Sequence, residues 1–198
     1  MALARKLGTV ALATAIALSA TQVADAQGYR WRGGSSPTQT TTPAQPTATT
    51  TPVNGSFDIN AELLYLIEEE KLAHDVYQTM SRKYGTRIFQ NISASEVTHQ
   101  QAVLPLLQAR GLSDPRLGFG QFRNPELQNL YNELVAQGNA SYRGALEAGR
   151  AIEVMDIADL EETLSQLSPA DADVRRVMEQ LLFASNNHLR AFERQLSR

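Results

Sequence analysis

The sequence predicts an all-α protein, a four-helix bundle with one extra short helix, over residues 57–198. Three observations support this fold class. From Phe57 onward, apolar residues recur every three or four positions, as they do along one face of a helix. No segment alternates apolar and polar residues for long enough to indicate a strand. Glycine and proline divide the region into four long helical segments and one short one.

The first expected helix spans residues 59–84. Asp58 is a suitable N-cap because its carboxylate can accept the free amides of the first turn, and Gly85 is a suitable stop. One face of this helix carries a continuous seam of inward-facing positions. The seam consists of Leu63, Leu66, Glu70, Ala73, Tyr77, Met80 and Tyr84.

The second helix is expected to begin with Ser93 or Ser95 as its N-cap, and Ser93 can form a capping box with Glu96. It is expected to end at Arg110, before Gly111. Its apolar seam is Ile92, Glu96, His99, Val103 and Leu106. A carboxylate and an imidazole therefore occupy positions where a bundle core ordinarily holds hydrocarbon.

A long connection, residues 111–124, follows and leads into a short helix that starts at Pro125 and stops before Gly138. The third long helix is expected over residues 141–167. Asp156 allows two interpretations, an N-cap after a break in this helix or an inward-facing acid. Ser168 and Pro169 then restart the chain as a final helix that runs almost to the C-terminus.

The first 26 residues are typical of a secretory signal peptide. Arg5 and Lys6 precede an apolar stretch over residues 7–20, and small residues at 24 and 26 fit a cleavage site before Gln27. The apolar stretch is too short for a transmembrane helix, which needs about 20 residues. We therefore expect an exported protein, periplasmic or secreted, without a transmembrane segment.

Residues 27–56 are expected to form a disordered linker between the signal peptide and the bundle. Between Ser35 and Pro52 there are eight threonines and four prolines, a composition that buries too little apolar surface to order the chain. The net charge is −3 and no basic stripe is present, so we expect no nucleic-acid partner. The chain has no cysteine, which excludes disulfides and thiolate metal sites.

Each of the four long seams carries polar groups near its middle. Acids and imidazoles on four facing helices would be mutually destabilising in a dry core unless cations neutralised them. Such carboxylate and imidazole ligands suit Fe, Mn or Zn. The candidate metal ligands are Glu70, Glu96, His99, Glu153, Asp156 and His188. Tyr77, Ser185 and Asn187 are expected beside the ligands, where they can orient them.

Several runs of sequence together resemble a bacterial and archaeal ferritin-like domain family of unknown function. These runs are residues 68–77, 95–99, 152–160 and 185–192, and the resemblance covers about residues 58–196. The spacing of Glu70, Ala73 and Tyr77 is also similar to rubrerythrin-type helices, in which the glutamate is a metal ligand.

This resemblance implies a ferritin-like bundle that holds iron, mononuclear or dinuclear, with Mn or Zn as alternatives. It implies as ligands Glu70, Glu96, His99, Glu153 and His188. Carboxylate-rich di-iron bundles use a Glu-x-x-His pair on two helices, whereas the last helix here has Ser185 three residues before His188. Either Asp156 replaces the missing acid, or the site holds a single metal or a weakly held second one.

The leading functional hypothesis is an exported ferritin-like metal-binding protein with oxidoreductase activity toward Fe(II), dioxygen or peroxide. Two alternatives stay open. One is a metal buffer or chaperone without turnover, and the other is a metal-free helical module that serves partner interaction. The sequence leaves the oligomeric state open.

Overall fold

The computed structural model describes residues 57–198, so the expected signal peptide and linker lie outside the described residues. This part of the chain contains no strand, which confirms the all-α prediction. Its helices are α1 (Ile59–Tyr84), α2 (Arg87–Ala109), α3 (Pro125–Ala140), α4 (Tyr142–Gln166), the 3-10 turn η2 (Pro169–Asp171) and α5 (Ala172–Leu196). Among these helices, none combines the length and apolar character needed to cross a bilayer.

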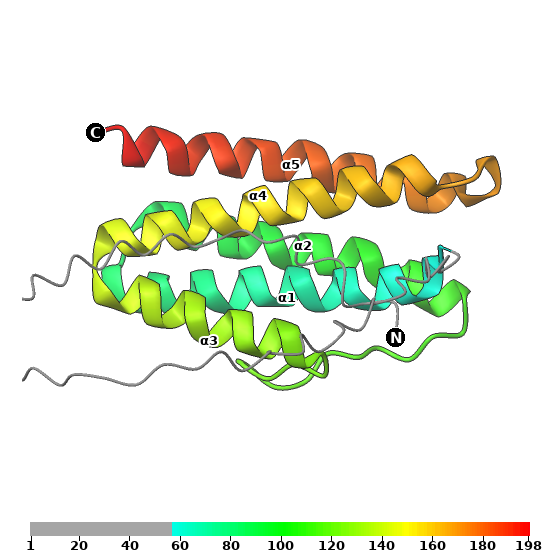
Figure 1. Ribbon diagram of the computed structural model, residues 1–198, viewed down its shortest axis with the longest axis horizontal. Coiled ribbons are helices and arrows are strands. Elements are labelled where there is room, and N and C mark those ends of the chain that lie inside the picture. The colour runs from blue at the N-terminus through cyan, green and yellow to red at the C-terminus, as the bar shows by residue number, and fades with distance from the viewer. Residues whose placement is uncertain (1–56) are drawn as a thin grey trace, which may run out of the picture. The chain divides into compact units, whose positions relative to one another are not determined.

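The long helices α1, α2, α4 and α5 form a helical bundle, and α3 lies on its outside (Figure 1). α1 packs against α2 and α4, and α5 packs against the same two helices, so α1 and α5 are diagonal in the bundle. α3 packs against α1 and α4, on the side of α1 that faces away from α5. Because α3 covers it, α1 is buried on almost every side of its central turns.

The predicted ends of α1 are confirmed. Asp58 Oδ1 accepts the amides of Asn60 at 2.9 Å and Ala61 at 3.4 Å, which satisfies two donors of the first turn. Gly85 ends the helix with φ of 63°, a left-handed conformation that costs glycine little.

The predicted start of α2 is wrong. The helix begins at Arg87 with Thr86 as its N-cap, six residues before Ser93, so only Gly85 and Thr86 separate it from α1. The reason is packing: Phe89 is fully buried and extends the seam of Ile92 back by one turn. Tertiary burial outweighs the local capping preference of Ser93, which lies buried inside the helix.

Two further boundaries differ from expectation. α3 continues through Gly138 to Ala140, because Gly138 serves helix packing rather than helix termination: a Cβ there would lie 2.5 Å from the Met80 side chain. α4 is continuous over Tyr142–Gln166, so Asp156 is not an N-cap and instead faces inward. Ser168 and Pro169 start η2, which leads directly into α5.

Two apolar layers close the bundle above and below its middle. At one end, Tyr77, Phe89 and Phe192 form an aromatic layer, with ring centroids 5.5 to 6.3 Å apart. A Cβ on Gly149 would lie 2.5 Å from Phe192, so the glycine lets α4 approach this layer closely. At the other end is an aliphatic layer: Leu63, Leu66, Ile67, Val103, Leu106, Leu107, Leu160, Leu167, Val174, Val177, Met178 and Leu181.

The connection between α2 and α3 is fastened to α1 by buried charges. Asp75 accepts the amide of Gly120 at 2.8 Å and pairs with Lys71, whose ammonium donates to the carbonyl of Gly118 at 2.9 Å. Glu68 accepts the amide of Arg123 at 2.6 Å. These contacts account for buried charges on the α3 side of α1, away from the centre of the bundle.

Candidate metal centre

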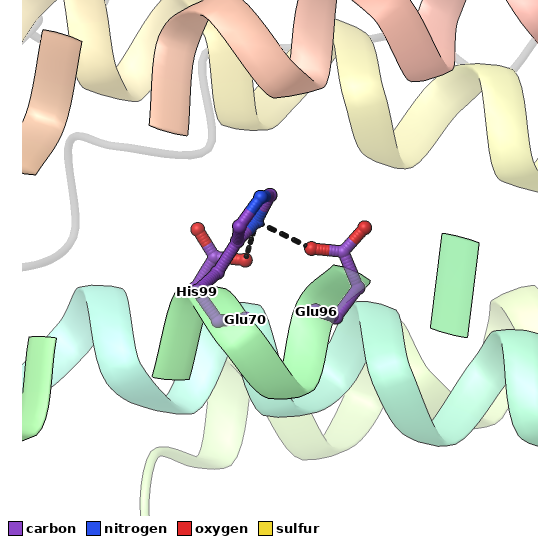
Figure 2. A group of neighbouring side chains, drawn as sticks. All are labelled: Glu70, Glu96 and His99. Carbon is purple, nitrogen blue, oxygen red and sulfur yellow. Dashed lines mark hydrogen bonds and ion pairs between the residues drawn. The ribbon is translucent and has the colours of Figure 1, made fainter. Parts of the chain in front are cut away.

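Between the two apolar layers, α1 and α2 bring together a first triad, Glu70, Glu96 and His99. Glu96 and His99 are one turn apart on α2, and Nδ1 of His99 lies 2.6 Å from Oε2 of Glu96. The same nitrogen lies 3.0 Å from Oε2 of Glu70, so the ring stands between two carboxylates (Figure 2). Nε2 of His99 is 3.4 Å from the Ser95 hydroxyl, which helps to turn Nδ1 toward the acids.

A second triad shares Glu96 with the first and adds Glu153 of α4 and His188 of α5. Nδ1 of His188 lies 3.1 Å from Oε1 of Glu96 and 3.5 Å from Oε2 of Glu153. The two oxygens of Glu96 therefore face different histidines. The two imidazole rings are nearly parallel, with centroids 5.6 Å apart. All four helices of the bundle contribute to one polar centre.

Several buried ligand atoms in this centre lack a hydrogen bond. Although Oε1 of Glu96 and Nδ1 of His188 are close, their contact does not have hydrogen-bond geometry. Oε1 of Glu70 and Oδ1 of Asp156 are also without a hydrogen-bond partner. Buried polar atoms almost always have a partner, so atoms of this kind indicate a shared missing one.

Asp156 completes the set of acids, although it belongs to neither triad. It lies one turn from Glu153 and is 6% exposed. It lines a small cavity together with Glu69, Glu70, Glu96 and Glu153. Ser185 is buried near Asp156 and acts to lower the pKa of that acid, and its hydroxyl donates to the Leu181 carbonyl at 3.0 Å.

Tyr77 and Asn187 were also expected beside the ligands, and only Tyr77 lies there. Tyr77 is fully buried and donates its hydroxyl to Oε1 of Glu153 at 2.6 Å, so it contacts a candidate ligand. Asn187, in contrast, lies on the exposed face of α5, where it binds the Phe183 carbonyl and Arg190. The expectation that Asn187 orients a ligand is wrong, because a residue next to His188 points about 100° away from it on a helix.

Glu96 and the histidines hold each other in their charged forms. Burial acts to raise the pKa of Glu96, but the two imidazoles outweigh it and hold this pKa at about 2. Burial acts to lower the pKa of His99, but Glu70 and Glu96 raise it to about 11. Glu153 and Glu96 likewise outweigh burial at His188 and raise its pKa to about 9.

The other three acids of the centre, which we call the outer acids, are Glu70, Glu153 and Asp156. Their pKa values are raised, because the four carboxylates together carry more negative charge than the imidazoles can balance. Burial and the nearby Asp156 raise the pKa of Glu70 well above its usual range. Burial, with a contribution from Glu96, raises the pKa of Glu153 to about 7. Burial raises the pKa of Asp156 to about 6. In the absence of a cation, these acids keep their protons to a higher pH than exposed carboxyl groups do.

The residues present fit a metal ion on two grounds. The ligand atoms of each triad all lie within 4.8 Å of one another, close to the largest separation, about 4 Å, of two atoms that each sit about 2 Å from one ion. If all four acids were ionised, the four carboxylates and two protonated imidazoles would carry two negative charges in excess, and the raised pKa values of Glu70, Glu153 and Asp156 reflect the cost of that excess. A divalent cation would neutralise this excess and replace the missing hydrogen-bond partners.

Glu69 was not selected in the sequence, although it lines the same cavity as the candidate ligands and is 6% exposed. Seam reasoning favours one face of α1 and therefore selects Glu70. The burial of neighbouring charges is the signal that was available: residues 68–71 are four consecutive charged side chains in a helix whose surroundings are apolar. Such a run indicates a helix that is covered on several sides.

The fold and the centre define a class: a helical bundle with a buried cluster of carboxylates and imidazoles at its middle. Residues 59–198 match the family described as "Uncharacterized protein domain (DUF2202)", and the chain belongs to this family. The uncharacterized protein MJ0754 of Methanocaldococcus jannaschii is 43% identical over 137 residues, which are 68% of this chain and 73% of that protein.

A solved structure supports the same relationship. The crystal structure of hypothetical protein MJ0754 from Methanococcus jannaschii is similar to this chain with a TM-score of 0.68 and 39% sequence identity. The match covers 80% of this chain and 86% of that chain.

Proposed function

We propose that this protein is a ferritin-like metal-binding protein whose centre holds two metal ions bridged by Glu96. The observation that carries the proposal is the position of this carboxylate. Its oxygens lie 2.6 and 3.1 Å from the Nδ1 atoms of two different histidines. Glu96 would be shared by the two ions, Glu70 and His99 would complete the ligands of one, and Glu153 and His188 would complete the ligands of the other.

The donor set supports iron as the metal. Each side of the centre offers one nitrogen and two carboxylate groups, counting Glu96 for both. Such mixed oxygen and nitrogen ligands suit Fe and Mn, and Zn accepts them as well. Three protein ligands leave coordination positions open, as catalytic metal sites require.

The surroundings of the centre support oxidoreductase chemistry. Bound iron would supply one-electron chemistry with dioxygen or peroxide. The aromatic and aliphatic layers keep bulk water from the ends of the site. The hydroxyl of Tyr77 donates a hydrogen bond to Glu153 and so fixes the orientation of one outer ligand. Glu70 and Glu153, whose pKa values are raised, can exchange protons as the charge of the centre changes.

A ferritin-like fold and export are parts of the same proposal. Four antiparallel helices with inward-facing acids and histidines are the arrangement that carboxylate-bridged metal proteins use. The secretory pattern of residues 1–26 supports export. If the protein is exported, the N-terminal residue of the protein recovered from the periplasm or medium should be Gln27. A chain that keeps Met1 and stays in the cytoplasm would contradict export.

The proposal is tested with purified, metal-free protein that is titrated anaerobically with Fe(II) and then exposed to dioxygen. We expect two Fe(II) per chain and dioxygen consumption faster than that of free Fe(II). Glu96→Gln should lose both, because it removes the bridging charge while keeping the volume. The matched control is Glu162→Gln, an exposed acid of α4, which should behave as wild type. Equal rates of dioxygen consumption by wild type and Glu96→Gln would show that this centre does not carry out the oxidation of Fe(II).

A metal-free bundle for partner interaction is the second candidate, and one observation favours it. His99 and Glu96 already form an ion pair at 2.6 Å, so imidazolium and carboxylate groups can partly neutralise each other. This candidate predicts that Fe(II), Mn(II) and Zn(II) leave the melting temperature unchanged. The metal centre predicts that at least one of them raises it, because an ion that binds only the folded state stabilises it.

A further inference from the structure

One face of the bundle consists of helix segments that carry no basic residue. Residues 59–70 of α1, 125–140 of α3 and 151–166 of α4 contain no lysine, arginine or histidine. The segments of α1 and α4 lie side by side, because Thr163 donates to Oε2 of Glu62 at 3.5 Å. A surface of one charge sign raises the local concentration of ions of the opposite sign.

On this face, four acids surround the buried Tyr65. Burial, followed by the charges of these acids, raises the pKa of its phenol. Three of them are partly exposed, whereas Glu69 is buried. We call this group the acidic vestibule, and it consists of Glu62, Glu69, Glu126 and Asp159.

Glu69 connects the acidic vestibule to the metal centre. It lines a cavity of about 10 Å³, room for a single water molecule or ion, between α1 and α4. Asp156 lines the same cavity with Oδ1 unpartnered and only 6% of its surface exposed. Glu70, Glu96 and Glu153 form the rest of the polar wall, so the cavity opens onto both triads.

We propose that divalent cations enter through the acidic vestibule, and that Glu69 and Asp156 hold the ion in the cavity before it reaches the ligands of the two triads. This inference rests on the proposed function. Carboxylates placed in succession replace the waters of a hydrated cation one by one, which avoids a bare ion in an apolar surrounding. The apolar layers at both ends of the centre offer no such ligands.

The test measures the rate of metal loading by stopped-flow absorption, with Co(II) as the probe added to metal-free protein. We expect Glu69→Gln to slow loading about tenfold, within the range by which charge steering changes association rates, and to keep the final occupancy. The double variant Glu62→Gln, Asp159→Asn should slow it at low salt and weaken its salt dependence. Glu179→Gln, an exposed acid of α5 outside the three segments of this face, is the control and should load as wild type.

The outcomes separate the route from the centre. Loading of Glu69→Gln at the wild-type rate, or equal slowing by Glu179→Gln, overturns the route while the centre stands. Loss of equilibrium occupancy in Glu69→Gln would make Glu69 a ligand of the centre, which also overturns the route. A wild-type protein that binds no Co(II) and no Fe(II) removes the centre itself. Circular dichroism shows whether Glu69→Gln folds. If it does not fold, the loading rate of the double variant Glu62→Gln, Asp159→Asn tests the route instead.

Discussion

Replacing Glu96 by glutamine should destabilise the metal-free protein by about 3 kcal/mol at pH 7. Glutamine mimics the protonated acid, so its cost follows from the pKa shift of Glu96, from an ordinary 4.5 to about 2. This difference, at about 1.4 kcal/mol per unit, corresponds to about 3 kcal/mol. Because the folded-state pKa is depressed, the stabilisation is present above pH 4.5 and is lost as the pH falls through about 2.

Urea unfolding of metal-free wild type and Glu96→Gln measures this difference. The free energies of unfolding should differ by about 3 kcal/mol at pH 7, by about half as much near pH 3, and should converge as the pH falls through about 2. Glu162→Gln should stay within about 0.5 kcal/mol of wild type, because exposed substitutions have small effects. A variant as stable as wild type at pH 7 would mean that the imidazoles do not hold Glu96 charged in the folded protein.

Three other predictions follow from the same contacts. Metal binding at pH 7 should release more than two protons, since pKa values of about 11 and 9 keep His99 and His188 protonated without metal and the raised pKa of Glu70 keeps a further proton on that acid; calorimetry in buffers of different ionisation enthalpy would show no dependence on buffer if this is wrong. Because the pKa of Glu153 is raised to about 7 in the folded protein, this acid contributes a stabilisation of the metal-free fold that is fully present below pH 4.5. That stabilisation is lost as the pH rises through 7. The metal-free melting temperature should therefore fall from pH 5 to 8, and that of metal-loaded protein should fall less. Gly149→Ala should cost about 1–3 kcal/mol in unfolding free energy, since the new methyl group meets the Phe192 ring; an unchanged value would mean that α4 shifts freely.

The centre could be predicted from the sequence because helical periodicity places side chains at defined levels. Glu70, Glu96, Glu153 and His188 each lie near the middle of an apolar seam, and side chains at the middle of antiparallel helices of similar length meet. Their convergence is therefore a consequence of the pattern. On the last helix a serine, Ser185, lies three residues before His188, and Asp156 of α4 lies near that serine.

The parts that could not be predicted depend on packing between distant segments. The apolar seam of α1 does not indicate that α3 covers the other side of this helix. The sequence therefore suggests that Glu69 is a surface acid, whereas in the structure it lines a cavity. The sequence around Ser93 is typical of a helix N-cap, but α2 begins earlier, at Arg87, because this places Phe89 in the core. Asn187 lies next to His188 in sequence, yet the turn of the helix separates their side chains.

The most direct test of the central claim is an experimental structure of protein loaded anaerobically with Fe(II), with diffraction recorded at the iron absorption edge. We expect two anomalous peaks, about 3.5–4 Å apart, on either side of the Glu96 carboxylate. One peak should lie next to Nδ1 of His99 and the other next to Nδ1 of His188. Absence of any peak between the four helices, with His99 still paired directly with Glu96, would contradict a metal centre.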